Sequence, residues 1–231
     1  MREIILDTET TGLDPNEGHR LVEIGCVEMV DRLVTGTTWH RYFNPQRDMP
    51  QEAFAVHGLS REFLADKPLF GDLAAEFADF LGDARLVIHN AGFDMRFLNA
   101  ELKLAKKTLL AMDRVTDTLA LARRKHPGAR VSLDELCARY GIDNSKRVKH
   151  GALLDAEILA EVYIELTGGR QTTLGLATQA VAVARREVAS GAARQRPTPL
   201  PSRLTEADIE VHRAFVASLG ENAIWKRYGE I

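Results

Sequence analysis

Residues 2–12, REIILDTETTG, place an apolar run directly before a pair of acidic side chains. The Ile- and Leu-rich residues 2–7 predict a strand, and the following TTGLDP is typical of a turn. Side chains two positions apart on a strand point to the same face, so Asp7 and Glu9 project together at its carboxyl end. Open α/β sheets place their sites at this edge. Two like charges on one face repel each other, and a cation between them would relieve that repulsion.

The pattern around this strand predicts an α/β fold. Runs rich in Ile, Val and aromatic residues predict further strands at 21–30, 33–43 and 85–90. Apolar residues at helical spacing predict helices over 71–82, 92–106, 133–140 and 152–167, and a strand-to-helix passage covers 113–126. Strands first, followed by alternating helices and strands, indicate a mixed sheet flanked by helices.

Two more clusters combine an acid with a histidine. HNAGFD follows a buried strand, and Asp94 falls in the first turn of the next helix, where the helix dipole favours a carboxylate. In HGALLD, His150 and Asp155 would be about 140° apart on a regular helix and could not share a face. We therefore expect His150 in the loop before the helix and Asp155 one turn inside it.

Each cluster alone has an ordinary explanation: a solvated strand end, an acid at a helix start, or a surface histidine in the basic stretch SKRVKH. Together the four acids supply oxygen ligands for two divalent cations, Mg²⁺ or Mn²⁺, and the histidine supplies a base for water. The set predicts a site for in-line phosphoryl displacement. We expect Asp7→Ala or Asp155→Ala to abolish turnover with little loss of fold.

DTETTG, HNAGFD and HGALLD also match, in order, the three motifs of the DEDDh 3′–5′ exonucleases, and the similarity extends over residues 3–169. That family has a ribonuclease H-like fold. The resemblance implies catalytic roles for five side chains, namely metal ligands Asp7, Glu9, Asp94 and Asp155 and general base His150. CARYGIDNSKR and HGALLDAEILAEVYIELTGG further resemble the epsilon, or proofreading, subunits of bacterial DNA polymerase III. This implies release of nucleoside 5′-monophosphates from a DNA 3′ end.

The resemblance also suggests which residues hold the terminal nucleotide. Glu52 and His57, in PQEAFAVHG, are expected to contact it, together with Asp7, Glu9 and Asp155. Apolar walls beside the acidic motifs are expected from Thr10, Leu13, Phe54 and Phe93. For Phe93, anchoring its own helix in the core is an equally good interpretation. A site that accepts any base is expected to use phosphate, sugar and stacking contacts.

The net charge of −3 hides an uneven distribution. Residues 1–169 carry 21 basic and 27 acidic side chains, whereas residues 170–203 carry six Arg and one Glu. Residues 204–231 carry three basic and five acidic side chains. An acidic body does not favour tight non-specific binding of nucleic acid, so we expect a polymerase to hold the duplex and present the 3′ end.

The segment 170–203 has the composition of a flexible basic linker. Ala, Gly, Gln and Arg dominate it, and it contains no aromatic residue. Its QTTLGL resembles the short peptide by which epsilon subunits touch the sliding clamp, beta, which implies contacts from Gln171, Leu174 and Leu176. A plain linker is the alternative, because Leu176 stands where an aromatic residue often closes such a peptide.

Residues 204–231 form a C-terminal segment too small to have its own core. An amphipathic helix capped by Thr205 is predicted there, and Trp225 lies in the tail that follows. This segment occupies the place where epsilon subunits bind the polymerase alpha subunit, and an unburied tryptophan independently indicates a docking surface. We therefore divide the chain into an exonuclease domain (1–169), a linker and a polymerase-docking segment.

The composition is that of a soluble, cytoplasmic protein. Hydrophobic residues make up 45% and charged residues 27%, and no apolar run approaches the ~20 residues that span a bilayer. We expect no membrane association, no signal peptide and no disulfide or zinc framework from Cys26 and Cys137, which are far apart.

Two other functions remain open. The first is an RNA-trimming exonuclease of the same superfamily, since the acids do not distinguish DNA from RNA. The long tethered tail argues against it, because a free-standing trimming enzyme needs none. The second is a non-catalytic module that bridges clamp and polymerase. The intact set of five catalytic residues argues against that function.

Overall fold

The computed structural model describes residues 1–145, 147, 149–168 and 204–220. The chain divides into two units, Met1–Leu176 and Ala177–Ile231. The expected boundary at 169–170, the linker with Gln171, Leu174 and Leu176, and the tail with Trp225 lie outside the described residues.

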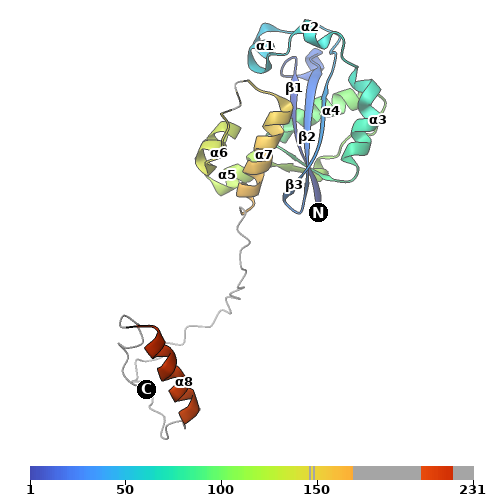
Figure 1. Ribbon diagram of the computed structural model, residues 1–231. Coiled ribbons are helices and arrows are strands. Elements are labelled where there is room, and N and C mark those ends of the chain that lie inside the picture. The colour runs from blue at the N-terminus through green and yellow to red at the C-terminus, as the bar shows by residue number, and fades with distance from the viewer. Residues whose placement is uncertain (146, 148, 169–203, 221–231) are drawn as a thin grey trace, which may run out of the picture. The chain divides into compact units, whose positions relative to one another are not determined.

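Five strands form one mixed sheet in the order β3-β2-β1-β4-β5 (Figure 1). β1 pairs antiparallel with β2, and β2 pairs antiparallel with β3. β4 is parallel to β1, and β5 is parallel to β4. The strands are β1 (Arg2–Thr10), β2 (Leu21–Val30), β3 (Leu33–Tyr42), β4 (Arg85–Ile88) and β5 (Val115–Asp117). The mixed sheet confirms the predicted α/β fold and puts the strand that ends in DTET at its centre.

Helices cover both faces of this sheet (Figure 1). They are α1 (Gln51–His57), α2 (Arg61–Leu64), α3 (Phe70–Leu81), α4 (Ala91–Leu104), α5 (Thr118–Lys125), α6 (Leu133–Tyr140) and α7 (Ala152–Leu166), with 3-10 turns η1 (Pro15–Glu17) and η2 (Met112–Arg114). The four predicted helices are confirmed to within two residues at each end. α1 and α2 were not predicted, because seven and four residues are too few to show a helical period.

The side chains of β1 alternate between two hydrophobic cores. Ile4 and Leu6 pack with α3 and α4, whereas Ile5 packs on the other face with α6 and α7. Because this alternation continues to the end of the strand, Asp7 and Glu9 lie on the α7 side. Thr8 lies on the α4 side. The two-residue period that places Ile4, Ile5 and Leu6 in the two cores therefore also turns Asp7 and Glu9 toward the start of α7.

Helix α7 lies close against β2 at Gly25. A Cβ at this position would lie 2.2 Å from the Leu153 nitrogen and 2.3 Å from the Ala152 carbonyl carbon, which is closer than side-chain carbons come to other atoms. Gly25 is also the cross-strand neighbour of Asp7. The absence of a side chain here is what lets the first turn of α7 reach the end of β1.

In the second unit, the predicted amphipathic helix is present as α8 (Glu206–Ser218). The Thr205 hydroxyl accepts a hydrogen bond from the Asp208 amide, and the Asp208 carboxylate accepts one from the Thr205 amide. This reciprocal pair caps the helix start. No helix in the described ranges is both long and apolar enough to cross a membrane.

Candidate active site

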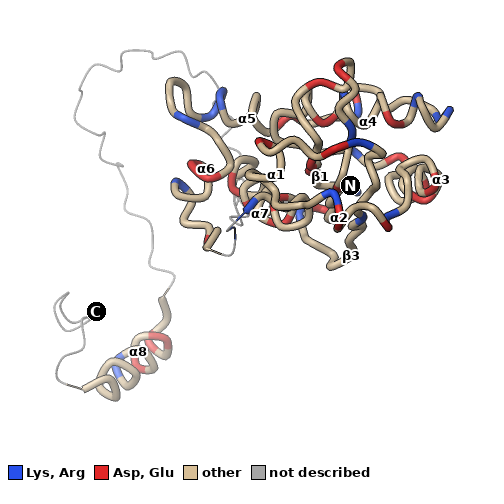
Figure 2. Tube along the Cα trace, turned by 90° about the horizontal axis from the view of Figure 1, so that it is seen from above, with Lys and Arg blue, Asp and Glu red and all other residues tan. Residues whose placement is uncertain are grey.

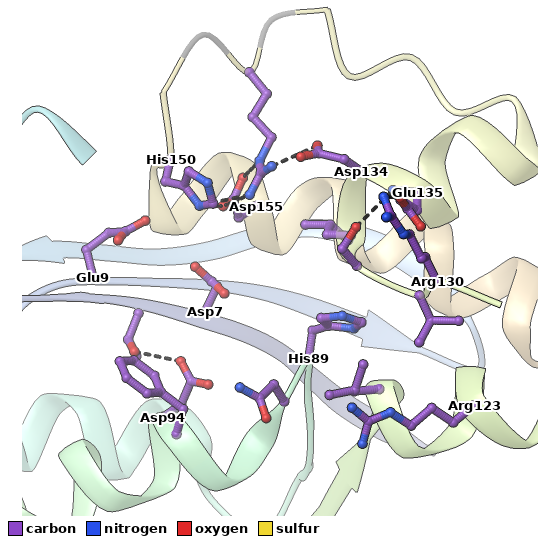
Figure 3. A pocket seen from close by; sticks show the side chains of 18 of the residues that line it. Asp7, Glu9, His89, Asp94, Arg123, Arg130, Asp134, Glu135, His150 and Asp155 are labelled. Atoms are coloured by element: carbon purple, nitrogen blue, oxygen red, sulfur yellow. Dashed lines mark hydrogen bonds and ion pairs between the residues drawn. The ribbon is translucent and has the colours of Figure 1, made fainter. Parts of the chain in front are cut away.

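An open cleft of about 1010 Å³ lies at the carboxyl end of β1 (Figure 3). All five residues expected to be catalytic line it, from three separate parts of the chain: Asp7, Glu9, Asp94, His150 and Asp155. The structure therefore brings together the three acidic clusters that the sequence separates by up to 148 positions.

Asp94 reaches the cleft from the first turn of α4, which directly follows β4. The turn between them is tight: Asn90 has a φ of 63°, in the left-handed region that asparagine tolerates better than most residues. The Thr8 hydroxyl, from β1, donates a hydrogen bond of 2.6 Å to Asp94 Oδ1. The strand and the helix are thus joined at the site by a buried side-chain contact.

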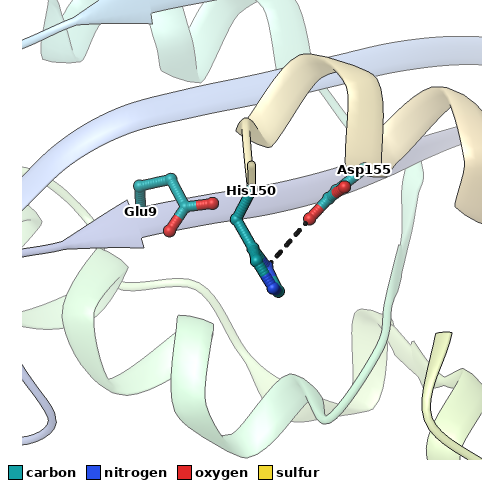
Figure 4. Close-up of side chains that lie close together, drawn as sticks. All are labelled: Glu9, His150 and Asp155. Atoms are coloured by element: carbon teal, nitrogen blue, oxygen red, sulfur yellow. Dashed lines mark ion pairs between the residues drawn. The ribbon is translucent and has the colours of Figure 1, made fainter. Parts of the chain in front are cut away.

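His150 and Asp155 flank the start of α7, as predicted. Gly151 is the N-cap, so His150 lies in the preceding loop and Asp155 in the first helical turn. The His150 amide donates to the Val56 carbonyl at 3.3 Å, which ties this loop to α1. One ligand atom from each of Glu9, His150 and Asp155 lies within 4.8 Å of the others (Figure 4).

Arg147 forms a two-pronged ion pair with Asp155 in the cleft. Its Nε and Nη2 atoms donate to the two carboxylate oxygens of Asp155 at 2.5 and 2.8 Å, and its Nη1 donates to Asp134 at 2.8 Å. Nη2 also lies 2.9 Å from His150 Nδ1. Only 8% of the Arg147 side chain is exposed. The guanidinium therefore connects α6, α7 and the histidine loop.

The other carboxylates have little positive charge near them. Burial, followed by repulsion from Asp94 and Glu9, raises the pKa of Asp7 well above its usual value. Burial, followed by repulsion from Glu23 and Asp155, raises the pKa of Glu9 to about 8. Burial also raises the pKa of Asp94 to about 7, although the Thr8 hydrogen bond acts in the opposite direction. Without a cation, these groups resist full ionisation at neutral pH.

Asp155 behaves differently from these three groups. Burial is the largest influence on its pKa and acts upward, but hydrogen bonds from Arg147 and His150 outweigh it, and the pKa is lowered. Asp155 is therefore ionised in the same cleft where its neighbours tend to hold protons. One member of the acidic cluster already has a cationic partner from the chain itself.

These shifts predict how the metal-free chain responds to pH. A carboxyl with a raised pKa in the folded state stabilises the fold fully below its unfolded pKa, and this stability is lost as pH rises toward the folded value. Raising the pH from about 4 to about 8 in EDTA should therefore lower the melting temperature, and Glu9→Gln should flatten the fall. The difference should be a few °C, since 1 kcal/mol corresponds to about 2–4 °C at this size. If the melting temperatures of both proteins fell equally as the pH rose, the raised pKa given to Glu9 would be contradicted.

A second cavity of about 420 Å³ adjoins the cleft beside Glu9. The two cavities share Thr8, Glu9, Leu13 and Phe93. Most of the residues expected to hold a nucleotide line this second cavity, namely Thr10, Leu13, Glu52, His57, Phe93 and Glu9. Asp7 and Asp155 line only the larger cleft. Phe54 does not line this cavity. Its ring instead faces the His150 loop, with 5.1 Å between the ring centre and Lys149 Nζ.

Three side chains that shape the site were not singled out from the sequence. Thr8 lies inside DTET, and its position between Asp7 and Glu9 was the one sequence feature that could have indicated a role in the site. Arg147 lies in the basic stretch before His150, and its composition alone gave no indication of a buried ion pair. Asp134 is an ordinary acid at a helix start until the fold places it against Arg147.

Comparisons with known proteins agree with this geometry. The family model described as Exonuclease matches residues 4–163. DNA polymerase III subunit epsilon of Rickettsia prowazekii is 50% identical over 219 residues, covering 94% of this chain and 96% of the relative. The protein of that name from Escherichia coli K12 is 46% identical, covering 97% of each chain.

Solved structures show the same fold. Exonuclease X in complex with 5′ overhanging duplex DNA is 27% identical, with a TM-score of 0.56, and the match covers 71% of this chain and 90% of that one. The nuclease domain of 3′hExo, a DEDDh family member bound to rAMP, has a TM-score of 0.61 at 17% identity and covers 72% of this chain and 91% of that one. With its motifs assembled in one cleft and its relatives matched along nearly their whole length, the chain belongs to the exonuclease family and, within it, to the DNA polymerase III epsilon subunits.

Proposed function

We propose that the chain cleaves the 3′-terminal phosphodiester bond of DNA and serves the replicative polymerase as its proofreading exonuclease. The observation that carries this proposal is the convergence of four carboxylates and a half-exposed histidine at the end of β1. Water attacks the phosphorus and the bond to the 3′ oxygen breaks. The products are a nucleoside 5′-monophosphate and a strand one nucleotide shorter with a new 3′ hydroxyl.

The four carboxylates fit divalent cations. Three of them have raised pKa values, for which burial is the largest cause. Hard oxygen donors are the ligands that Mg²⁺ and Mn²⁺ prefer. We assign two such ions to Asp7, Glu9, Asp94 and Asp155. When bound, they would supply Lewis-acid polarisation of the phosphodiester and compensation of developing negative charge.

His150 is the proposed general base. Its side chain is 48% exposed, so water reaches it, and its ring lies next to Glu9 and Asp155 (Figure 4). A base must lie within hydrogen-bond reach of the proton that it removes. The loop that carries His150 is held by Val56 and Arg147, which keeps the imidazole over the carboxylates rather than in open solvent.

The adjoining cavity is the proposed site of the 3′-terminal nucleotide. Phe93 and Leu13 provide apolar walls for a base of any identity, and Thr10 and Glu52 provide polar groups for the sugar. His57 Nδ1 accepts a hydrogen bond from the Leu59 amide, so Nε2 carries the remaining proton. This Nε2 is buried and makes no hydrogen bond of good geometry with the described residues, and the Thr10 backbone is the polar group that acts on the ring.

Proofreading requires preference for unpaired 3′ ends. A strand must separate from its template to enter the cavity, and a mismatched end separates at a lower cost, by roughly a few kcal/mol. The acidic first 169 residues are consistent with a duplex that the polymerase holds and presents. We place this activity in the bacterial cytoplasm, where the polymerase works.

Release of mononucleotides tests the proposal directly. With Mg²⁺ or Mn²⁺, the chain should release nucleoside 5′-monophosphates faster from a mismatched 3′ end than from a matched one. EDTA should stop the release. An RNA-trimming enzyme would instead favour a ribonucleotide end, and a non-catalytic bridging module would release nothing from either substrate.

The C-terminal segment, residues 204–231, is the proposed attachment to the polymerase alpha subunit. Val211, Phe215 and Leu219 recur at helical spacing on and just after α8, and each is about half exposed or more. Such a row of apolar side chains is typical of a helix that docks into a groove. Trp225 and the clamp contacts of Gln171, Leu174 and Leu176 complete the proposed set.

Deleting residues 205–231 should separate binding from catalysis. The truncated chain should digest a free oligonucleotide at the full rate, because every residue of the cleft is retained. It should no longer co-purify with the alpha subunit. The double substitution Val211→Ser and Phe215→Ser is a milder test of the same surface. Equal recovery of the complex with and without these residues would contradict the docking role.

A further inference from the structure

We propose that Arg123 and Arg130 bind the phosphates of the DNA strand immediately 5′ of the scissile bond. This inference rests on the proposed function, because it extends the path of the same substrate. It adds a basic subsite outside the carboxylate cluster and outside the cavity for the terminal nucleotide.

The cleft continues well beyond the carboxylates. On the side away from Glu9 it is lined by Leu119 and Arg123 of α5 and by Arg130 and Val131 of the loop before α6. Figure 3 shows Glu9 at one side of this cleft and the two arginines at the other, with Asp7 and His89 between them. The far part of the cleft therefore lies in line with the proposed reaction centre.

The direction of the strand follows from the two cavities. If the terminal nucleotide occupies the cavity beside Glu9, its 5′ phosphate lies at the carboxylates, which stand where the two cavities join. We place the next nucleotides in the rest of the same cleft, which Arg123 and Arg130 border.

This border includes a basic segment in an otherwise acidic domain. Residues 118–131 contain Arg123, Arg124, Lys125 and Arg130 and no acid, and Asp134 and Glu135 of α6 line the cleft after them. Figure 2 shows basic segments beside α5. Lys125 donates to backbone carbonyls at the end of α7, so its position is accounted for by the fold. Arg123 and Arg130 are the two members that line the cleft.

Both guanidinium groups are available to a ligand. Arg130 is 90% exposed, and its only ion pair in the described part of the chain is a long one, with 3.6 Å between Nη1 and Glu135 Oε1. Arg123 is exposed and makes no ion pair with any described residue. An exposed arginine with only a weak ion pair gives up little interaction energy when it binds a phosphate. Its guanidinium can form two parallel hydrogen bonds with the phosphate oxygens.

The test compares a long substrate with a short one. In R123A/R130A, KM for a 3′-mismatched oligonucleotide should rise about 5- to 10-fold, as expected for two exposed charge contacts. Hydrolysis of the p-nitrophenyl ester of thymidine 5′-monophosphate should not change, because that molecule has no upstream phosphate. Binding of labelled single-stranded DNA in Ca²⁺ should lose about 0.7 from its salt-dependence slope for each phosphate contact removed.

The matched control is R124A/R139A, which removes two exposed arginines from α5 and α6 that do not line the cleft. It should leave both substrates and the salt slope unchanged. Equal loss on both substrates in R123A/R130A, or no loss of DNA affinity, would overturn the subsite. Failure of the wild-type chain to hydrolyse either substrate would instead contradict the proposed function, and the DNA-binding comparison would still decide the subsite.

Discussion

Asp7→Asn is expected to abolish nucleotide release while making the metal-free protein more stable. Loss of one cation ligand removes several kcal/mol of transition-state stabilisation, which corresponds to a rate reduction of roughly a thousand-fold or more. At the same time the substitution removes a buried carboxyl whose pKa is raised by burial and by repulsion from Asp94 and Glu9. In EDTA at pH 8 the melting temperature should therefore rise by a few °C.

Asp155→Asn should abolish activity equally but lower the stability. Asp155 is the partner of the largely buried Arg147 guanidinium, through two hydrogen bonds of 2.5 and 2.8 Å. Breaking a buried ion pair on one side costs about 3–5 kcal/mol, and the retained contact with Asp134 reduces this cost. We expect a melting temperature lower by about 5 °C. The sequence alone predicts little loss of fold when either aspartate is replaced. The ion pair with Arg147 changes that expectation for Asp155.

Activity and melting temperature, measured on the same preparations, check both statements. The double variant Asp155→Asn and Arg147→Gln is the control, because it removes both members of the pair. It should recover much of the lost stability and remain inactive. A stabilised Asp155→Asn protein would contradict the role given to Arg147, and an Asp7→Asn protein with near-normal rates would contradict its assignment as a ligand.

Gly25→Ala is expected to damage the site by displacing the start of α7. The new Cβ would lie 2.2–2.4 Å from backbone atoms of Ala152 and Leu153, whereas ordinary contact begins near 3.4 Å. The start of α7 must therefore retreat by about 1 Å, and Asp155 moves with it. A displacement of this size can cost about 100-fold in rate. The overpacking should also cost about 1–3 kcal/mol of stability.

Gly71→Ala is the matched control for this substitution. Gly71 lies in α3, and a Cβ added there would meet no atom nearer than the Ala105 Cβ at 3.9 Å, which is an ordinary contact. The activity of this variant should be unchanged, and its stability should be equal or slightly higher because alanine favours helix. Rates and Mn²⁺ affinity distinguish the two variants. Normal values of both in Gly25→Ala would contradict the close approach of α7.

Much of the fold and the candidate site could be predicted from local pattern. The two-residue period of β1 indicated that Asp7 and Glu9 share a face, and both line the cleft. The angular argument for His150 and Asp155 predicted a loop residue before a helix, and α7 begins at Ala152. These predictions succeeded because each depends on the geometry of one element, which a few residues determine.

The contacts made between elements could not be predicted in this way. Arg147 and Asp134 are 13 positions apart and meet only because α6 and α7 pack side by side. The close approach at Gly25 depends on the crossing of a strand and a helix that are 127 positions apart in the chain. α1, which lines the nucleotide cavity, is only seven residues long and has too little periodicity to be recognised.

A crystal structure of the protein with Mn²⁺ and thymidine 5′-monophosphate would show whether the four carboxylates bind two cations. Anomalous scattering identifies manganese independently of any assumption about the ligands. We expect two manganese sites held by Asp7, Glu9, Asp94 and Asp155, with the nucleoside in the cavity lined by His57 and Phe93. Manganese bound elsewhere, or a nucleotide outside that cavity with the carboxylates free of metal, would contradict this expectation.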